Sequence, residues 1–158
     1  MAATTTVFSD LLRQLQTDWP LLTFAPGDIS RWSSETATVH YNAQEDHSAV
    51  TLLHETAHGL LGHTSYDYDI DLIKLERAAW HKATELGKHY GVDIDDNTIE
   101  LALDSYRDWL HARSTCPTCG RNGAQTNEHQ YTCLVCEAHW HVNDARNCGL
   151  KRRKLTHA

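Results

Sequence analysis

The residues best suited to chemistry in this chain are His54, Glu55 and His58, which form the pattern HETAH. In a helix, residues four positions apart point the same way, so both imidazoles can reach one metal ion while Glu55 lies beside it. Zinc lowers the pKa of water, and a nearby carboxylate can take the proton as the water attacks a carbonyl carbon. The pattern therefore predicts a catalytic zinc site, with His54 and His58 as ligands and Glu55 as general base.

A catalytic zinc site needs a third protein ligand. Glu76 is the strongest candidate, because it lies about 40° from the centre of an apolar stripe on the helix expected over residues 69–90. A carboxylate on such a stripe is costly unless it is paired or bound to a metal. A metzincin would have a histidine at position 64, which is a threonine here. The alternatives that stay open for the third ligand are His63 and one of Asp67, Asp69 and Asp71.

A donor to the oxyanion would complete such a site. Three side chains lie near the expected ligands in the sequence and are candidates for stabilising the transition state: Tyr66, His63 and His81. Their spacing does not rank them.

Four of the five cysteines form two CxxC knuckles that are separated by 13 residues. This spacing is typical of a zinc ribbon, in which four thiolates surround one structural zinc ion. A module of about 35 residues cannot stabilise itself by burial, so the metal substitutes for a core. Cys148 is left over, and we expect it to be a free thiol. The predicted ligands of the structural zinc are Cys116, Cys119, Cys133 and Cys136.

The rest of the chain must position these two groups. Apolar periodicity and turn residues predict an α+β fold: a small, mainly helical domain with a short β-sheet, followed by the ribbon. We expect a helix over 7–19, a loop from Pro20 to Asp28, a strand over 36–41, a helix capped by Ser48, and helices over 69–90 and 97–112. The expected parts are a metallopeptidase-like domain over 1–112, the ribbon over 113–150 and a basic tail over 151–158.

Charge is unevenly distributed along the 158 residues. Residues 1–112 carry 7 Lys and Arg against 18 Asp and Glu, whereas residues 113–158 carry 7 against 3. An acidic domain repels nucleic acid, but the basic end could attract it. A solvated tail is the alternative reading of the four consecutive basic residues, Lys151, Arg152, Arg153 and Lys154.

No apolar run reaches the roughly 18 residues that a membrane-spanning helix needs, so no contact with a membrane is expected. The first residues lack the basic and apolar regions of a secretory signal. We therefore expect an intracellular, cytoplasmic protein, in which cysteines bind metal more often than they form disulfides.

The segment HETAHGLLGH, followed by LERAAWHKATEL, resembles the minimal zincins of the ImmA/IrrE type over about residues 36–90. The resemblance implies His54, His58 and Glu76 as zinc ligands, Glu55 as base, and a regulatory peptidase that cleaves a protein substrate. The layout of a peptidase domain before a zinc ribbon is also similar to that of SprT-like proteases, which act on DNA-bound proteins. The downstream HG pair that carries their third histidine is absent here.

Two functions follow from these patterns. The first is an intracellular zinc metallopeptidase with two Zn²⁺ ions, in which the ribbon docks a protein or peptide substrate or contacts nucleic acid. The second is a non-catalytic zinc-binding module that binds nucleic acid or a regulatory protein. Glu55 favours the first, since a purely structural site needs no free carboxylate beside two ligands.

Overall fold

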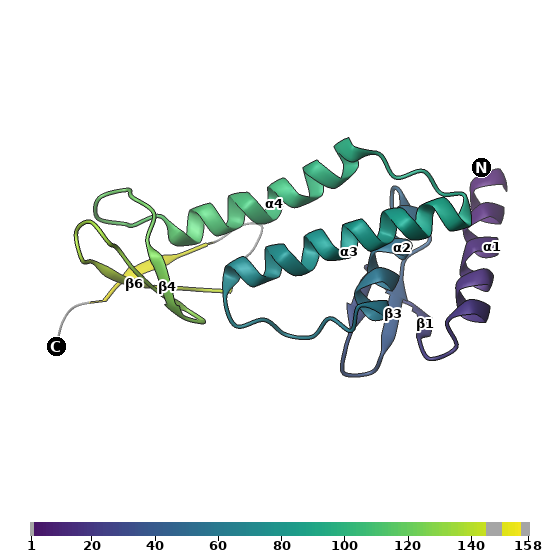
Figure 1. Cartoon of the computed structure of the whole chain (residues 1–158), viewed down its shortest axis with the longest axis horizontal. Coiled ribbons are helices and arrows are strands. Elements are labelled where there is room, and N and C mark those ends of the chain that lie inside the picture. Colours follow the sequence, from purple (N-terminus) through teal and green to yellow (C-terminus); the bar gives the residue numbers. More distant parts are fainter. Residues whose placement is uncertain (1, 145–149, 156–158) are drawn as a thin grey trace. The chain divides into compact units, whose positions relative to one another are not determined.

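The structure, a computed structural model, describes residues 2–144 and 150–155 (Figure 1). These residues form four α-helices and two small β-sheets, which confirms the predicted α+β fold class. None of the helices in this part of the chain is long and apolar enough to cross a membrane. The chain divides into two compact units, Met1–Thr64 with Leu75–Ile99 and Ser65–Lys74 with Glu100–Ala158.

The sheet of the first unit consists of β1 (Thr23–Pro26), β2 (Arg31–Ser33) and β3 (Thr38–Tyr41). The central strand β3 pairs in parallel with β1 and antiparallel with β2, so β2 is an edge strand. The sequence predicts only β3, and the expected loop from Pro20 to Asp28 is wrong over β1. A strand of three or four residues is too short to show a clear alternation, and Pro26 is tolerated at the end of an edge strand.

Three helices contribute to the first unit: α1 (Ala2–Asp18), α2 (Ser48–Leu60) and, from Leu75 onward, α3 (Asp69–Tyr90). Helix α2 contacts β2 and β3 and buries an apolar face that includes Leu52, Leu53 and Ala57. This packing places the predicted catalytic residues of α2 beside the edge strand.

The helix cap predicted at Ser48 is wrong, because Ser48 is the first residue of α2 itself. The cap is His47, whose backbone is left-handed (φ 57°) and whose side chain makes no capping hydrogen bond. The carbonyl of His47 accepts the N–H of Thr51 at 3.0 Å, so the backbone alone begins the helix.

The second unit contains most of α4 (Asp96–Ser114) and an antiparallel sheet in the order β4-β5-β6-β7. The strands are β4 (Ala124–Asn127), β5 (Gln130–Thr132), β6 (His139–Val142) and β7 (Arg152–Lys154). The predicted basic tail thus contributes the fourth strand.

The core of the ribbon is built around two aromatic rings. Tyr131 and Trp140 are almost fully buried, and their rings stack with centroids 5.7 Å apart. Gly123 is required beside them, since an added Cβ would lie 2.5 Å from the Trp140 ring and 2.6 Å from the Thr132 carbonyl oxygen. A core of this size is small, so the four cysteines beside it contribute a large share of the stability when they hold a metal.

A buried ion pair joins the helices of the second unit to the ribbon. Arg113, near the end of α4, donates from Nε to Asp69 Oδ2 at 2.6 Å. The guanidinium carbon Cζ of Arg113 lies 4.8 Å from the centroid of the Trp109 ring. The remaining guanidinium donors bind the carbonyls of Glu128 and Asn143. The Tyr131 hydroxyl also donates to Asp69, so the carboxylate is shared between helix and sheet.

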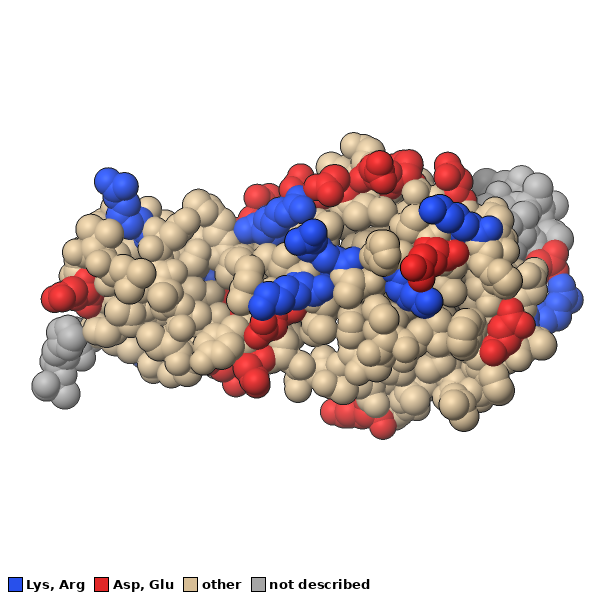
Figure 2. Space-filling model, viewed as in Figure 1, with Lys and Arg blue, Asp and Glu red and all other residues tan. Residues whose placement is uncertain are grey.

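Helix α4 carries an acidic stripe, with Figure 2 showing red side chains along the upper margin where α4 lies in Figure 1. Arg107 compensates part of this charge through Glu100 and Asp104, at 2.8 and 2.9 Å. The exposed members of the stripe, every fourth residue, are Asp96, Glu100, Asp104 and Asp108.

Candidate metal centres

The structure brings the side chains of His54, His58 and Glu76 together in the first unit, as one of two groups that could hold a metal ion. The histidines come from α2 and the carboxylate from α3, where Glu76 lies between the buried residues Leu72 and Ala79. All three ligand side chains are buried, with exposed fractions of 6%, 8% and 5%. A buried carboxylate between two imidazoles satisfies the condition that made Glu76 the leading sequence candidate.

The spacing of the ligand atoms fits a tetrahedral metal. His54 Nε2 lies 3.1 Å from His58 Nε2 and 3.1 Å from Glu76 Oε2, and His58 Nε2 lies 3.3 Å from Glu76 Oε1. Ligands about 2.0–2.1 Å from zinc at tetrahedral angles are about 3.3 Å apart. The spacing of the three donors is therefore compatible with one zinc ion.

The ionisation of Glu76 suits a ligand. Burial opposes ionisation, but hydrogen bonds from His54 and His58 outweigh it and lower the pKa of Glu76 to about 2. The carboxyl group is therefore in its metal-binding, deprotonated form across the physiological range.

His63 lies beside the ligand His58 rather than among the three converging donors. Its Nδ1 is 2.8 Å from Nδ1 of His58, on the side of the His58 ring opposite to the ligand atom Nε2. Burial lowers the pKa of His63, which favours a neutral ring that accepts a hydrogen bond. In the tautomer in which His58 donates from Nδ1 to His63, the Nε2 lone pair of His58 would be available to a metal. The geometry thus favours Glu76 over His63 as third ligand.

His54 is oriented by an aromatic contact instead. Its ring stacks on the indole of Trp80 with centroids 4.0 Å apart and an interplanar angle of 25°. Within the described chain, His54 Nδ1 and Trp80 Nε1 are buried and have no hydrogen-bond partner. Trp80 lies one helical turn after Glu76 on α3, so the same helix supplies the third donor and the surface that holds His54 in place.

Glu55 lies at the edge of this group and is bound to the sheet. Its Oε2 accepts the backbone N–H of Trp32, in β2, at 2.8 Å. Burial raises the pKa of Glu55 above its ordinary value, and the attraction of His54 and His58 offsets only part of that effect. A desolvated carboxylate with a raised pKa is a stronger base than an exposed one.

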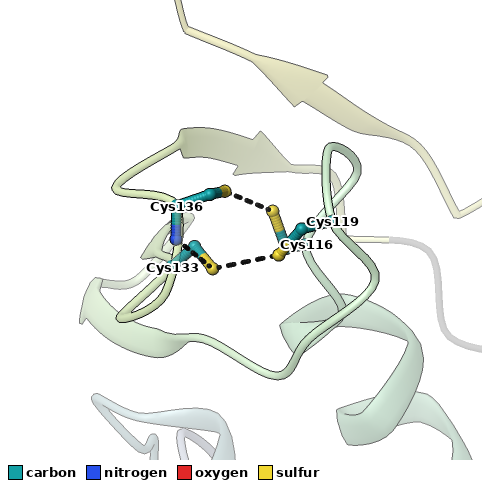
Figure 3. A group of neighbouring side chains, drawn as sticks. All are labelled: Cys116, Cys119, Cys133 and Cys136. Carbon is teal, nitrogen blue, oxygen red and sulfur yellow. Dashed lines mark hydrogen bonds between the residues drawn. The ribbon is translucent and has the colours of Figure 1, made fainter.

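The second group consists of the four cysteines of the two knuckles (Figure 3). The Sγ atoms of Cys116 and Cys136 are 3.7 Å apart, and those of Cys119 and Cys133 are 3.5 Å apart. Four thiolates about 2.3 Å from a tetrahedral zinc are about 3.8 Å from one another. This group, near the C-terminal end of the chain, fits a zinc-ribbon-like module.

The pKa values of Cys116 and Cys136 are shifted in opposite directions. Burial opposes ionisation of Cys116, but the backbone N–H groups of Cys119 and Thr118 lower its pKa to about 6. The backbone N–H of Ala138 favours the Cys136 thiolate, yet burial and the three neighbouring thiols raise the pKa of Cys136 to about 12. Like charges so close together cannot all persist, and a divalent cation removes this conflict.

Other residues with a predicted role lie elsewhere. His81 is on the surface of α3, where its side chain is 83% exposed and lies 3.6 Å from Glu85. Tyr66 belongs to the second unit and lines a cavity of about 290 Å³ with Asp69 and Arg113. Asp69 is committed to Arg113, while Asp71 pairs with Lys74 at 3.0 Å. Cys148 lies outside the described residues.

Trp32 and Trp80 are the site residues that sequence reasoning missed. Trp80 could have been found, because it follows Glu76 by four residues and so shares its helix face. Trp32 could not, because no spacing relates it to α2.

No family model, curated protein or solved structure matches this chain.

Proposed function

We propose that this chain is a zinc-dependent metallopeptidase, with zinc on His54, His58 and Glu76 and Glu55 as general base. The observation that carries the proposal is the convergence of three donors at tetrahedral spacing with a fourth, unligated carboxylate beside them. The proposal agrees with the resemblance of residues 36–90 to minimal zincins. A second zinc ion on the four cysteines stabilises the ribbon.

The chemistry assigned to the chain is proton transfer and orientation. When bound, zinc supplies Lewis acidity that lowers the pKa of water and polarises a peptide carbonyl. Glu55 takes one proton from the water as its oxygen bonds to the carbonyl carbon. Glu55 then gives that proton to the amide nitrogen as the C–N bond breaks, which leaves a carboxylic acid and an amine, and the acid passes its remaining proton to the amine. The Trp32 N–H binds one carboxylate oxygen of Glu55 and leaves the other oxygen to accept the proton.

A structural metal site is the second candidate, and the burial of all three ligands favours it. In that case the chain is a binding module, and Glu55 serves only as an acceptor for Trp32. The two candidates differ in what Glu55→Gln removes: the base in the first, and nothing but a charge in the second.

The test measures zinc content and peptide cleavage together. Parent and Glu55→Gln proteins are incubated with a mixture of unstructured peptides of varied sequence, and new termini are identified by mass spectrometry. The proposal expects two zinc ions per chain in both proteins, and cleavage at least about 100-fold slower in the variant. Glu85→Gln, the same change at an exposed carboxylate of α3, is the matched control. Equal cleavage by Glu55→Gln and the parent, or one zinc ion per chain, refutes the proposal.

The basic end of the ribbon is a proposed contact for nucleic acid. All three residues of β7 are exposed, and Arg153 lies opposite His141 in the sheet. The ring of His141 stacks on that of His129 with centroids 5.5 Å apart and an interplanar angle of 13°. Exposed cations beside flat rings suit the phosphates and bases of a single strand. This surface would bring a peptidase to protein substrates held on nucleic acid.

A further inference from the structure

Trp32 connects the edge strand β2 to the helix that carries the metal ligands. Its backbone N–H donates to Glu55 Oε2 at 2.8 Å, and its indole Nε1–H donates to the carbonyl of His63, also at 2.8 Å. One residue thus contacts both the residue proposed as base and the segment that follows α2. Both hydrogen bonds are partly buried, where they exchange less readily with water.

The indole of Trp32 lies directly on α2. At Gly59, an added Cβ would come within 2.9 Å of Trp32 Cζ3 and 3.2 Å of Cε3, so any larger residue would displace the ring. Glu55 and Gly59 are spaced by four on one side of α2, and His63 follows the left-handed Gly62 just after the helix ends at Leu60. Trp32 therefore contacts α2 through its backbone and its ring, and the segment after α2 through its Nε1.

The third of these contacts leads to a metal ligand. The residue whose carbonyl Trp32 binds, His63, places its own Nδ1 2.8 Å from Nδ1 of His58. His63 is also fixed by its backbone N–H, which donates to the His58 carbonyl at 3.0 Å. Residues that bind the far nitrogen of a ligating histidine set its ring orientation and its tautomer. The position of the His63 ring then depends on the backbone that Trp32 holds.

We propose that Trp32 is a positioning residue, which orients Glu55 through its backbone N–H and His58 through His63. The inference rests on the proposed zinc site on α2 and α3, but it does not depend on peptide cleavage. The packing of the Trp32 ring explains why residue 59, near the end of α2, is a glycine, although glycine has a low helix propensity. The ring of Trp32 needs that space.

Zinc affinity is the first readout. In the full chain, Trp32→Phe keeps the backbone N–H and an aromatic ring, and removes the indole donor to His63 together with the second ring. We expect the His54–His58–Glu76 site to lose about tenfold or more in zinc affinity, measured by competition with a chelator of known affinity. The cysteine site should be unchanged. Trp19→Phe is the matched control, because it also removes one indole hydrogen bond, to Tyr90 Oη at 3.1 Å. An equal affinity in the two variants overturns the proposal.

A second pair of variants tests the packing of the ring. Gly59→Ala should weaken zinc binding in the parent, whereas in a Trp32→Leu background it should add little, because the clashing ring is gone. Additive losses in the double variant would overturn the assigned contact. The outcome is separable from the function: a parent that cleaves no peptide, but whose zinc binding weakens in Trp32→Phe, supports the positioning role and refutes the peptidase.

Discussion

Arg113 and Asp69 form an ion pair in which each side chain is 3% exposed. The guanidinium group contacts the carboxylate twice, from Nε at 2.6 Å and from Nη2 at 3.3 Å. Two charges are removed from water here, and they are tolerable only because the carbonyls of Glu128 and Asn143 and the Tyr131 hydroxyl complete the hydrogen bonding. The ion pair and its hydrogen bonds therefore connect the ribbon to the helical segments of the second unit.

Breaking this pair should be costly. Asp69→Asn leaves Arg113 as a buried charge without its counter-ion, and we expect a loss of about 3–5 kcal/mol in the free energy of unfolding. Asp71→Asn, the same change two residues later in an exposed pair with Lys74, should cost less than about 1 kcal/mol. Urea denaturation of both variants measures the difference. In Asp69→Asn/Arg113→Met the loss should be smaller than the sum of the single losses, and a purely additive result would contradict the pairing.

The third metal ligand can be tested by zinc content. Glu76→Gln removes the anionic donor, and we expect one zinc ion per chain in place of two, with the cysteine site still filled. Glu76→Asp, which keeps the charge on a shorter side chain, should bind zinc more weakly than the parent but better than the glutamine variant. Retention of both ions by Glu76→Gln would transfer the ligand role to another residue, with His63 the nearest choice.

The ribbon should depend on its metal. Cys133→Ser removes one of four thiolates, and we expect loss of the structural zinc and of the near-ultraviolet circular dichroism of the stacked Tyr131 and Trp140. Cys148→Ser is the control, since four cysteines already complete the site. Zinc loss from the Cys148 variant would show that the ligand set differs from the one drawn in Figure 3.

Alkaline pH provides a test of the packing between α1 and α3. The Tyr90 hydroxyl donates to Asp18 at 2.7 Å, and burial together with this carboxylate raises the pKa of Tyr90 to about 12. The unfolded chain releases this proton near pH 10, so the stabilisation is complete below that pH and is lost as the pH rises through 12. The stability difference between parent and Tyr90→Phe should therefore be constant up to pH 10 and shrink above it. A difference that grows with pH would contradict the assignment.

The nucleic-acid surface can be tested by charge reversal. Arg153→Glu/Lys154→Glu should weaken binding to a fluorescent single-stranded oligonucleotide and reduce the slope of log affinity against log salt by about 1.4. Lys82→Glu/Lys88→Glu, an equal charge change on α3, should have a smaller effect. Identical losses in both pairs would indicate that net charge alone attracts the strand.

Much of this molecule follows from short-range patterns. The helices, β3, the His54–His58 pair and each cysteine knuckle rest on spacings of two to four residues, which the sequence displays directly. Glu76 is 18 residues beyond His58, yet the sequence also predicts it as a ligand, because a carboxylate on an apolar stripe requires a partner. These features follow from short spacings or, for Glu76, from a charged residue on an apolar helix face.

The remainder depends on contacts between distant segments. Strands β1 and β2 are stabilised by pairing with β3 rather than by their own propensity. Trp32 meets Glu55 only because β2 packs on α2, and Arg113 meets Asp69 across 44 residues. No periodicity encodes such pairs, so the sequence alone does not predict the contacts of Trp32 and Arg113.

The bond between Glu55 and Trp32 also occupies a backbone donor of the edge strand. In the edge strand and the turn before it, the backbone N–H groups of Trp32 and Ser30 donate to the carboxylates of Glu55 and Glu45, at 2.8 and 3.0 Å. An exposed sheet edge with free donors invites another chain to add a strand, and the two carboxylates remove that opportunity. Glu55→Gln retains an acceptor oxygen at this edge, whereas Glu55→Ala exposes a free N–H. Aggregation of Glu55→Ala but not of Glu55→Gln would therefore indicate that the unpaired N–H of Trp32, and not the loss of the carboxylate as a base, causes the aggregation.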